Sequence, residues 1–125
     1  MDEPGMKKIL AVMSDLFFAA QINDEAKKLA MTAVFVTDQA SAIEQLDSNP
    51  ALVILDLNCA SARPLELIGE ITARDPAIPT VGFVSHVQED LKRKALEAGC
   101  GTVLARSVFA KNVQSLIAAQ VPAGD

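Results

Sequence analysis

The stretch from Ala51 to Leu57 constrains the fold more than any other part of the sequence. Five apolar residues follow Pro50 and lead directly into Asp56. A short uninterrupted apolar run is typical of a strand buried on both faces, as in a parallel sheet covered by helices. Asp56 then lies at the carboxyl end of the strand, where open α/β sheets bind their ligands. An aspartate that only forms a turn is the alternative, and this stretch alone does not exclude it.

Apolar segments of two kinds alternate along the chain. Short apolar runs, which are typical of strands, occupy residues 8–13, 32–36, 51–57, 80–84 and 102–105. Helical spacing of apolar residues marks residues 15–29, 38–47, 64–75, 88–99 and a last helix that carries Phe109, Val113, Leu116 and Ile117. Because parallel strands need helical crossovers, the alternation predicts an α/β fold. We expect a three-layer, doubly wound, five-stranded parallel sheet with the flavodoxin-like strand order 2-1-3-4-5.

Capping residues and apolar stripes define the expected helices. The expected caps and helix ends are Ser14 or Asp15, Thr37 or Asp38, Pro64 in a first turn, and Gly99 at a C-terminus. The expected buried stripes are Phe18, Ile22, Ala26 and Leu29 in the first helix, and Ala40, Ile43 and Leu46 in the second.

The length of 125 residues suits one domain with a single core. We expect this domain to span residues 7–121, between flexible tails at residues 1–6 and 122–125. No apolar run approaches the roughly 20 residues that cross a bilayer, and the acidic start of the chain is unlike a signal peptide. A cytoplasmic protein without a membrane partner is therefore expected.

Charge and motif content exclude several classes of function. Eleven basic residues against sixteen acidic ones give a net charge of −5, which argues against a nucleic-acid partner. The two cysteines, Cys59 and Cys100, form neither a C-x-x-C motif nor a disulfide framework, so both are expected to be reduced. Neither a glycine-rich dinucleotide motif nor a P-loop follows any expected strand, so no nucleotide cofactor is indicated.

The expected topology gathers polar residues at one edge of the sheet. With strand order 2-1-3-4-5, the switch point lies between the first and third strands. Met13, Ser14 and Asp15 would then face Asp56 across a crevice. Ser85 and Arg106, at the ends of the fourth and fifth strands, should join them.

Over residues 7–120 the sequence resembles the receiver domains of bacterial two-component response regulators, the CheY-like family. Asp56 matches the aspartate that accepts a phosphoryl group from a histidine kinase, and Ser85 matches the Ser/Thr that bonds this group. Arg106-Ser107 stands where the family has a lysine followed by a cis-proline. Met13-Ser14 replaces the acidic pair that holds magnesium, and Val103 replaces an aromatic switch residue.

These departures make the metal-site positions Met13 and Ser14 degenerate. Magnesium requires near-octahedral oxygen ligands, and a thioether is the wrong donor. We therefore expect no metal or other cofactor. A weaker alternative is a makeshift magnesium site formed by Asp15, Asp56 and Asn58, although Asp15 also suits a helix N-cap.

Arg106 leads to the most specific hypothesis from the sequence. A guanidinium can make a bidentate pair with a carboxylate. In a crevice without magnesium, Arg106 is expected to contact Asp56, take the place of the cation and hold the site in one state. A solvated arginine at a strand end is the alternative.

Two other side chains near the expected crevice carry weaker hypotheses. Cys59 lies in the loop after Asp56 and is either a redox-sensitive or phosphorylated thiol or an incidental residue. His86 is the single histidine of the sequence and is expected at the rim beside Ser85.

Two functions fit these residues. The preferred one is a non-enzymatic pseudo-receiver: a signalling module that binds proteins, with weak or absent magnesium-dependent phosphorylation. The alternative is a functional phosphoacceptor, phosphorylated on Asp56 by a histidine kinase, that uses Ser85, Arg106 and magnesium and at most catalyses its own phosphorylation. Expected partners are a histidine kinase or a downstream signalling protein. A homodimer through the fourth helix, fifth strand and fifth helix is also expected, on a surface that includes Lys92-Arg93-Lys94 and the helix from Phe109.

Overall fold

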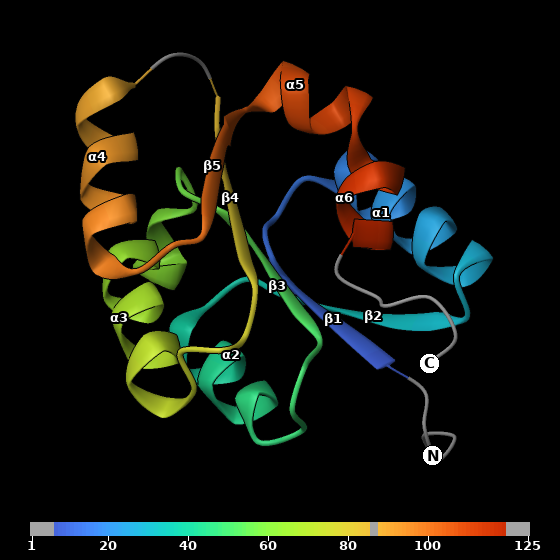
Figure 1. Ribbon diagram of the computed structural model, residues 1–125, viewed down its shortest axis with the longest axis horizontal. Coiled ribbons are helices and arrows are strands. Elements are labelled where there is room, and N and C mark those ends of the chain that lie inside the picture. Colours follow the sequence, from blue (N-terminus) through green and yellow to red (C-terminus); the bar gives the residue numbers. More distant parts are fainter. Residues whose placement is uncertain (1–6, 86–87, 120–125) are drawn as a thin grey trace.

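A five-stranded parallel sheet forms the centre of the structure, a computed structural model that describes residues 7–85 and 88–119 (Figure 1). The strands are β1 (Lys7–Val12), β2 (Met31–Val36), β3 (Leu52–Asp56), β4 (Thr80–Val84) and β5 (Thr102–Ala105). Their order is β2-β1-β3-β4-β5, with every neighbouring pair parallel. The predicted fold class and strand order are confirmed. The expected tails at residues 1–6 and 122–125 and the rim residue His86 lie outside the described residues.

Helices cover both faces of the sheet. In the described part of the chain they are α1 (Leu16–Lys28), α2 (Gln39–Leu46), the 3-10 turn η1 (Ala60–Ala62), α3 (Pro64–Arg74), α4 (Glu89–Ala98), α5 (Arg106–Lys111) and α6 (Val113–Ala119). α1 and α6 lie on one face, and α2, α3 and α4 lie on the other (Figure 1). None of these helices is long and apolar enough to cross a membrane.

The last helix is divided at Asn112, where a single helix was expected. The N–H of Asn112 donates to the carbonyl of Phe109 (3.0 Å), and its Nδ2 donates to the carbonyl of Val108 (2.8 Å). A side chain that bonds nearby backbone groups competes with helix propagation, so α5 ends and α6 begins here. The predicted stripe survives the break, because Phe109, Val113 and Ile117 are all buried.

The core consists of two apolar layers, one on each side of the sheet. An aromatic cluster lies in the layer beneath α1: the ring of Phe18 is 5.2 Å from that of Phe83 and 5.6 Å from that of Phe109. The Phe83 and Phe109 rings stack with centroids 4.9 Å apart. This cluster packs α1 and α5 against the end of β4.

The buried stripe of α2 agrees with the prediction except at Ala40: Leu46 is buried and Ile43 packs against the core as expected. Ala42 and Leu46 are buried, whereas Ala40 is exposed. Asp38 caps this helix by accepting a hydrogen bond from the Ser41 N–H (2.8 Å), and residues four apart from Ala42 then face the sheet. The expected contribution of Ala40 to the core is wrong.

The other predicted caps are in place. Asp15 caps α1, since its Oδ1 accepts from the N–H of Phe18 (3.0 Å). Pro64 occupies the first turn of α3, and Gly99 ends α4 with a φ of 117°. These caps determine where each helix starts or stops, and Asp15 does so near the carboxyl ends of the strands.

Candidate functional site

Strand register brings the predicted site residues to one edge of the sheet. Val12 lies opposite Leu55, Asp56 opposite Phe83, and Val84 opposite Ala105. Met13, Ser85 and Arg106 each follow directly after the last of these paired residues in their strands. Asp56 lies in the same row, at the β1–β3 switch point that the sequence predicted.

Asp56 is a half-buried carboxylate with a single described partner. Its Oδ1 accepts a hydrogen bond from the backbone N–H of Asn58 (2.9 Å). Burial raises the pKa of Asp56 above its usual value, and the Asn58 hydrogen bond offsets part of this effect. Among residues 7–85 and 88–119, no cationic side chain forms an ion pair with it. Its negative charge is therefore not neutralised by an ion pair within the described chain.

The hypothesis of a contact between Asp56 and Arg106 is wrong, because Arg106 binds Asp15. Its Nη2 donates to Asp15 Oδ2, and its guanidinium lies 4.3 Å above the centre of the Phe18 ring. A cation over an aromatic face gains electrostatic attraction in addition to the ion pair. Both interactions come from the first turn of α1, so together they direct the guanidinium toward α1.

Ser85 is held by the loop that follows Asp56. Its N–H and its hydroxyl both donate to Asn58 Oδ1, each at 2.8 Å. Asn58 Nδ2 in turn donates to Gln88 Oε1 (3.0 Å). The Asn58 amide thereby connects the end of β3 to the end of β4 and the start of α4. Gln88 could not be selected from the sequence, because its role depends on a contact thirty residues away.

The metal-site positions do not fit a resident magnesium ion. Met13 is 2% exposed and packs in the core layer beneath α1, so its side chain is directed away from solvent. Ser14 is exposed and neutral. The weaker alternative set was Asp15, Asp56 and Asn58. One Asp15 oxygen caps α1 and the other binds Arg106, which leaves Asp56 as the carboxylate open to a cation. Asp56 would then be the single protein carboxylate on the ion, and water would have to fill most of the octahedral positions.

Both cysteines are free thiols, and both are buried. Cys59 Sγ lies 3.7 Å from the carbonyl oxygen of Thr37 and 3.6 Å from Ser61 Oγ. Burial raises the pKa of the Cys100 thiol above its usual value. A reactive cysteine needs exposure and a stabilised thiolate, so this geometry favours an incidental role for Cys59.

Two large apolar side chains at the start of α1 were not selected from the sequence. Leu16 is 83% exposed and Phe17 is 89% exposed, directly after Asp15 at the start of α1. Their position outside the Phe18 stripe was the signal that could have identified them. An adjacent exposed apolar pair close to the candidate site is a candidate contact surface for another protein.

The structure resembles solved receiver domains closely, although the sequences are distant. No protein-family model and no curated protein matches the sequence. A response regulator from Hahella chejuensis is 20% identical, with a TM-score of 0.83, and the match covers 95% of this chain and 98% of that one. A CheY-like receiver domain protein from Methanospirillum hungatei JF-1 is 14% identical (TM-score 0.79; 93% and 94% covered). An orphan response regulator of H. pylori is 16% identical (TM-score 0.78; 94% and 98% covered). The chain therefore has the fold of response-regulator receiver domains.

Proposed function

We propose that this chain is a pseudo-receiver: a signalling module that acts by binding proteins, with weak or absent magnesium-dependent phosphorylation of Asp56. The observation that carries the proposal is the pairing of Arg106 with Asp15. Arg106, the residue directly after β5, is paired with Asp15 at the start of α1, while Asp56 has no cationic partner among the described residues.

Electrostatics explain why this arrangement opposes phosphorylation. Phosphoryl transfer depends on positioning and on neutralising charge on the equatorial oxygens. Here the acidic pair is absent, Arg106 is bound to Asp15, and the Ser85 hydroxyl donates to Asn58. A phosphoryl group on Asp56 could bind the Ser85 hydroxyl only after the Ser85–Asn58 hydrogen bond broke. It could bind Arg106 only after the Arg106–Asp15 ion pair broke.

The described surface offers two regions for protein partners. One is the exposed pair Leu16 and Phe17 at the crevice rim. The other is the surface of α4, β5 and α5, where Leu96 and Val108 are exposed. The basic run on α4 is partly neutralised within its own helix: Arg93 pairs with Asp90 and Glu97, and Lys94 pairs with Asp90. The apolar residues therefore support partner binding better than the lysines do.

The alternative function, a working phosphoacceptor, is favoured by the alignment of Asp56, Ser85 and Arg106 at the ends of neighbouring strands. It requires Arg106 to leave Asp15 and a magnesium ion to be held by Asp56, Asp15 and the Asn58 carbonyl. A histidine kinase would then be the partner.

Magnesium with acetyl phosphate or beryllofluoride distinguishes the two functions. We expect wild-type amide NMR spectra to remain unchanged near Asp56, and intact mass to show no phosphorylated species. Asp56→Asn is the negative control. Ser14→Asp supplies an exposed carboxylate at the edge of the crevice and should increase any response to magnesium. A wild-type response at Asp56 that is as large as that of Ser14→Asp and absent from Asp56→Asn would overturn the pseudo-receiver proposal and establish the alternative.

A further inference from the structure

The outer edge of β2 is a long apolar strand edge. β2 forms one end of the sheet, and its sequence, Met-Thr-Ala-Val-Phe-Val, contains no charge and no proline. Proteins usually protect such edges with charges, prolines, bulges or very short strands, because unpaired N–H and C=O groups pair readily with another strand. The opposite edge, β5, has only four residues, so β2 is the longer strand template.

The direction of the backbone groups follows from one hydrogen bond. The Met13 N–H donates to the Val36 carbonyl (3.0 Å), so Val36 directs its backbone groups toward β1. Backbone direction alternates along a strand. Val34 and Thr32 therefore also face β1, whereas Met31, Ala33 and Phe35 direct their N–H and C=O groups toward the outer edge.

The alternation along β2 also determines on which face of the sheet each side chain lies. Met31, Ala33 and Phe35 all belong to the core layer beneath α1. In an antiparallel pair, residues that face each other lie on the same side of the sheet. A second β2 related by a two-fold axis can therefore place Ala33 opposite Ala33, and Met31 opposite Phe35, with outward backbone groups meeting at each pair. A shift by one residue would place outward groups against inward ones.

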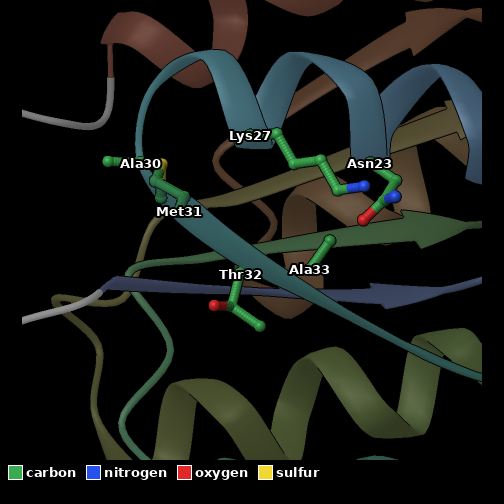
Figure 2. A pocket seen from close by; sticks show the side chains of 6 residues that line it. All are labelled: Asn23, Lys27, Ala30, Met31, Thr32 and Ala33. Carbon is green, nitrogen blue, oxygen red and sulfur yellow. The ribbon is translucent and has the colours of Figure 1, made fainter. Parts of the chain in front are cut away.

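A hollow beside the outer edge of β2 has room for a side chain from a second copy of the strand. It has a volume of about 280 Å³ and is lined by Asn23, Lys27, Ala30, Met31, Thr32 and Ala33. Figure 2 shows that the Lys27 and Asn23 side chains extend from α1 above Ala33. In the register described above, Phe35 of a second copy lies opposite Met31, at the wall of this hollow.

Residues of opposite charge lie near the two ends of β2. Lys27 and Lys28 end α1 just before β2, and Asp38 follows β2 as the cap of α2. Antiparallel pairing brings the amino end of one strand to the carboxyl end of the other. Lys28 already pairs with Glu25 of its own helix, so Lys27 is the lysine that would lie near Asp38 of the other copy, at both ends of the pair.

We propose that the outer edge of β2 pairs antiparallel with β2 of a second copy of this chain, with Ala33 opposite its own counterpart. This inference does not depend on the proposed signalling function. A standard protein interface buries about 1,600 Å², which is more than two short strands supply. The dimer is therefore expected to be weak and to form in the micromolar to millimolar range.

Charge exchange at Ala33 tests the pairing by sedimentation equilibrium. Ala33→Lys places two like charges against each other, as does Ala33→Glu, and each variant alone should dimerise at least ~10-fold more weakly than wild type. An equimolar mixture of the two should recover dimerisation, because opposite charges then meet. Ala73→Lys, at an exposed position on α3, is the matched control and should dimerise as wild type does. A monomeric wild type throughout this range, or a dimer that neither Ala33 variant weakens, would overturn the proposal.

A disulfide across the two-fold axis gives a second, site-specific result. Opposing residues of a hydrogen-bonded antiparallel pair have Cα atoms about 5.5 Å apart, within the range that a disulfide spans. Oxidised Ala33→Cys should form a covalent dimer on a non-reducing gel, since both native cysteines are buried. Ser107→Cys, exposed on α5, should remain monomeric. Cross-linking of Ser107→Cys and not of Ala33→Cys would assign the dimer to the α4–β5–α5 surface and contradict the proposal.

Discussion

Asp15 and Arg106 form an ion pair at the carboxyl ends of the strands, although ninety-one positions separate them in the sequence. Asp15 uses one carboxylate oxygen to cap α1 and the other to bind the guanidinium of Arg106. The guanidinium also lies over the Phe18 ring in the same helical turn. One residue therefore couples the start of α1 to the end of β5 and determines which carboxylate the arginine neutralises.

Substitutions at Asp15 should separate its two roles. Asparagine is a good N-cap, so Asp15→Asn keeps the cap and removes only the charge. For a partly exposed ion pair this should lower the free energy of unfolding by about 0.5–1 kcal/mol. Asp15→Ala removes the cap as well and should cost about 1 kcal/mol more. Urea denaturation measures both. Equal losses for the two variants would mean that the cap contributes nothing.

Two adjacent phenylalanines should differ sharply in their effect on stability. Phe18 is 7% exposed and contacts Phe83 and Phe109, whereas Phe17 is 89% exposed. Phe18→Ala should lower the free energy of unfolding by about 3–5 kcal/mol, because it leaves a cavity in the core. Phe17→Ala should change it by less than about 0.5 kcal/mol. Thermal or chemical denaturation of the pair is the measurement, and a large loss in Phe17→Ala would contradict its placement on the surface.

Alanine at two glycines should have effects of opposite sign. Gly99 ends α4 at a φ of 117°, and a Cβ there would collide with the Thr72 side chain. Gly99→Ala should therefore destabilise the protein by at least about 1 kcal/mol. At Gly69, within α3, an added Cβ meets no atom within 4 Å, so Gly69→Ala should stabilise the protein by about 0.5–1 kcal/mol. If both variants lose stability, the open space at Gly69 is contradicted.

The raised pKa of Asp56 should make part of the stability depend on pH. Burial is the larger cause of the shift, and the Asn58 hydrogen bond opposes it. Because the folded-state pKa exceeds the unfolded value near 3.8, the folded state binds the proton more tightly. The stabilisation is complete below the unfolded pKa and is lost as the pH rises through the folded pKa. Asp56→Asn should therefore gain stability relative to wild type as the pH rises above this window. A stability difference that does not change with pH would contradict the shift.

Local patterns predicted the fold well because each element carried its own information. The apolar run ending at Asp56, the cap at Asp38 and the stop at Gly99 depend on neighbouring residues only, and the structure contains all three. The partner of Arg106 could not be predicted in this way. Two carboxylates, Asp15 and Asp56, lie at the same end of the sheet. Arg106 pairs with Asp15, beside the Phe18 ring, and the position of that ring depends on packing against Phe83 and Phe109. The break at Asn112 likewise depends on a side-chain hydrogen bond that the apolar stripe concealed.

Release of Arg106 should change the ionisation of Asp56. In Asp15→Asn the guanidinium of Arg106 loses its charged partner. Asp56 is a carboxylate without an ion pair among the described residues, and it ends β3, which β4 separates from β5. A cation that approaches a carboxylate favours its ionised form and lowers its pKa. The pKa of Asp56, followed by carboxyl ¹³C NMR, should therefore fall in Asp15→Asn relative to wild type. The double variant Asp15→Asn/Arg106→Ala should lack this decrease, because no guanidinium remains to move. An Asp56 pKa that is equal in wild type and Asp15→Asn would show that Asp15 does not hold Arg106 away from the crevice, and it would remove the main support for the pseudo-receiver proposal.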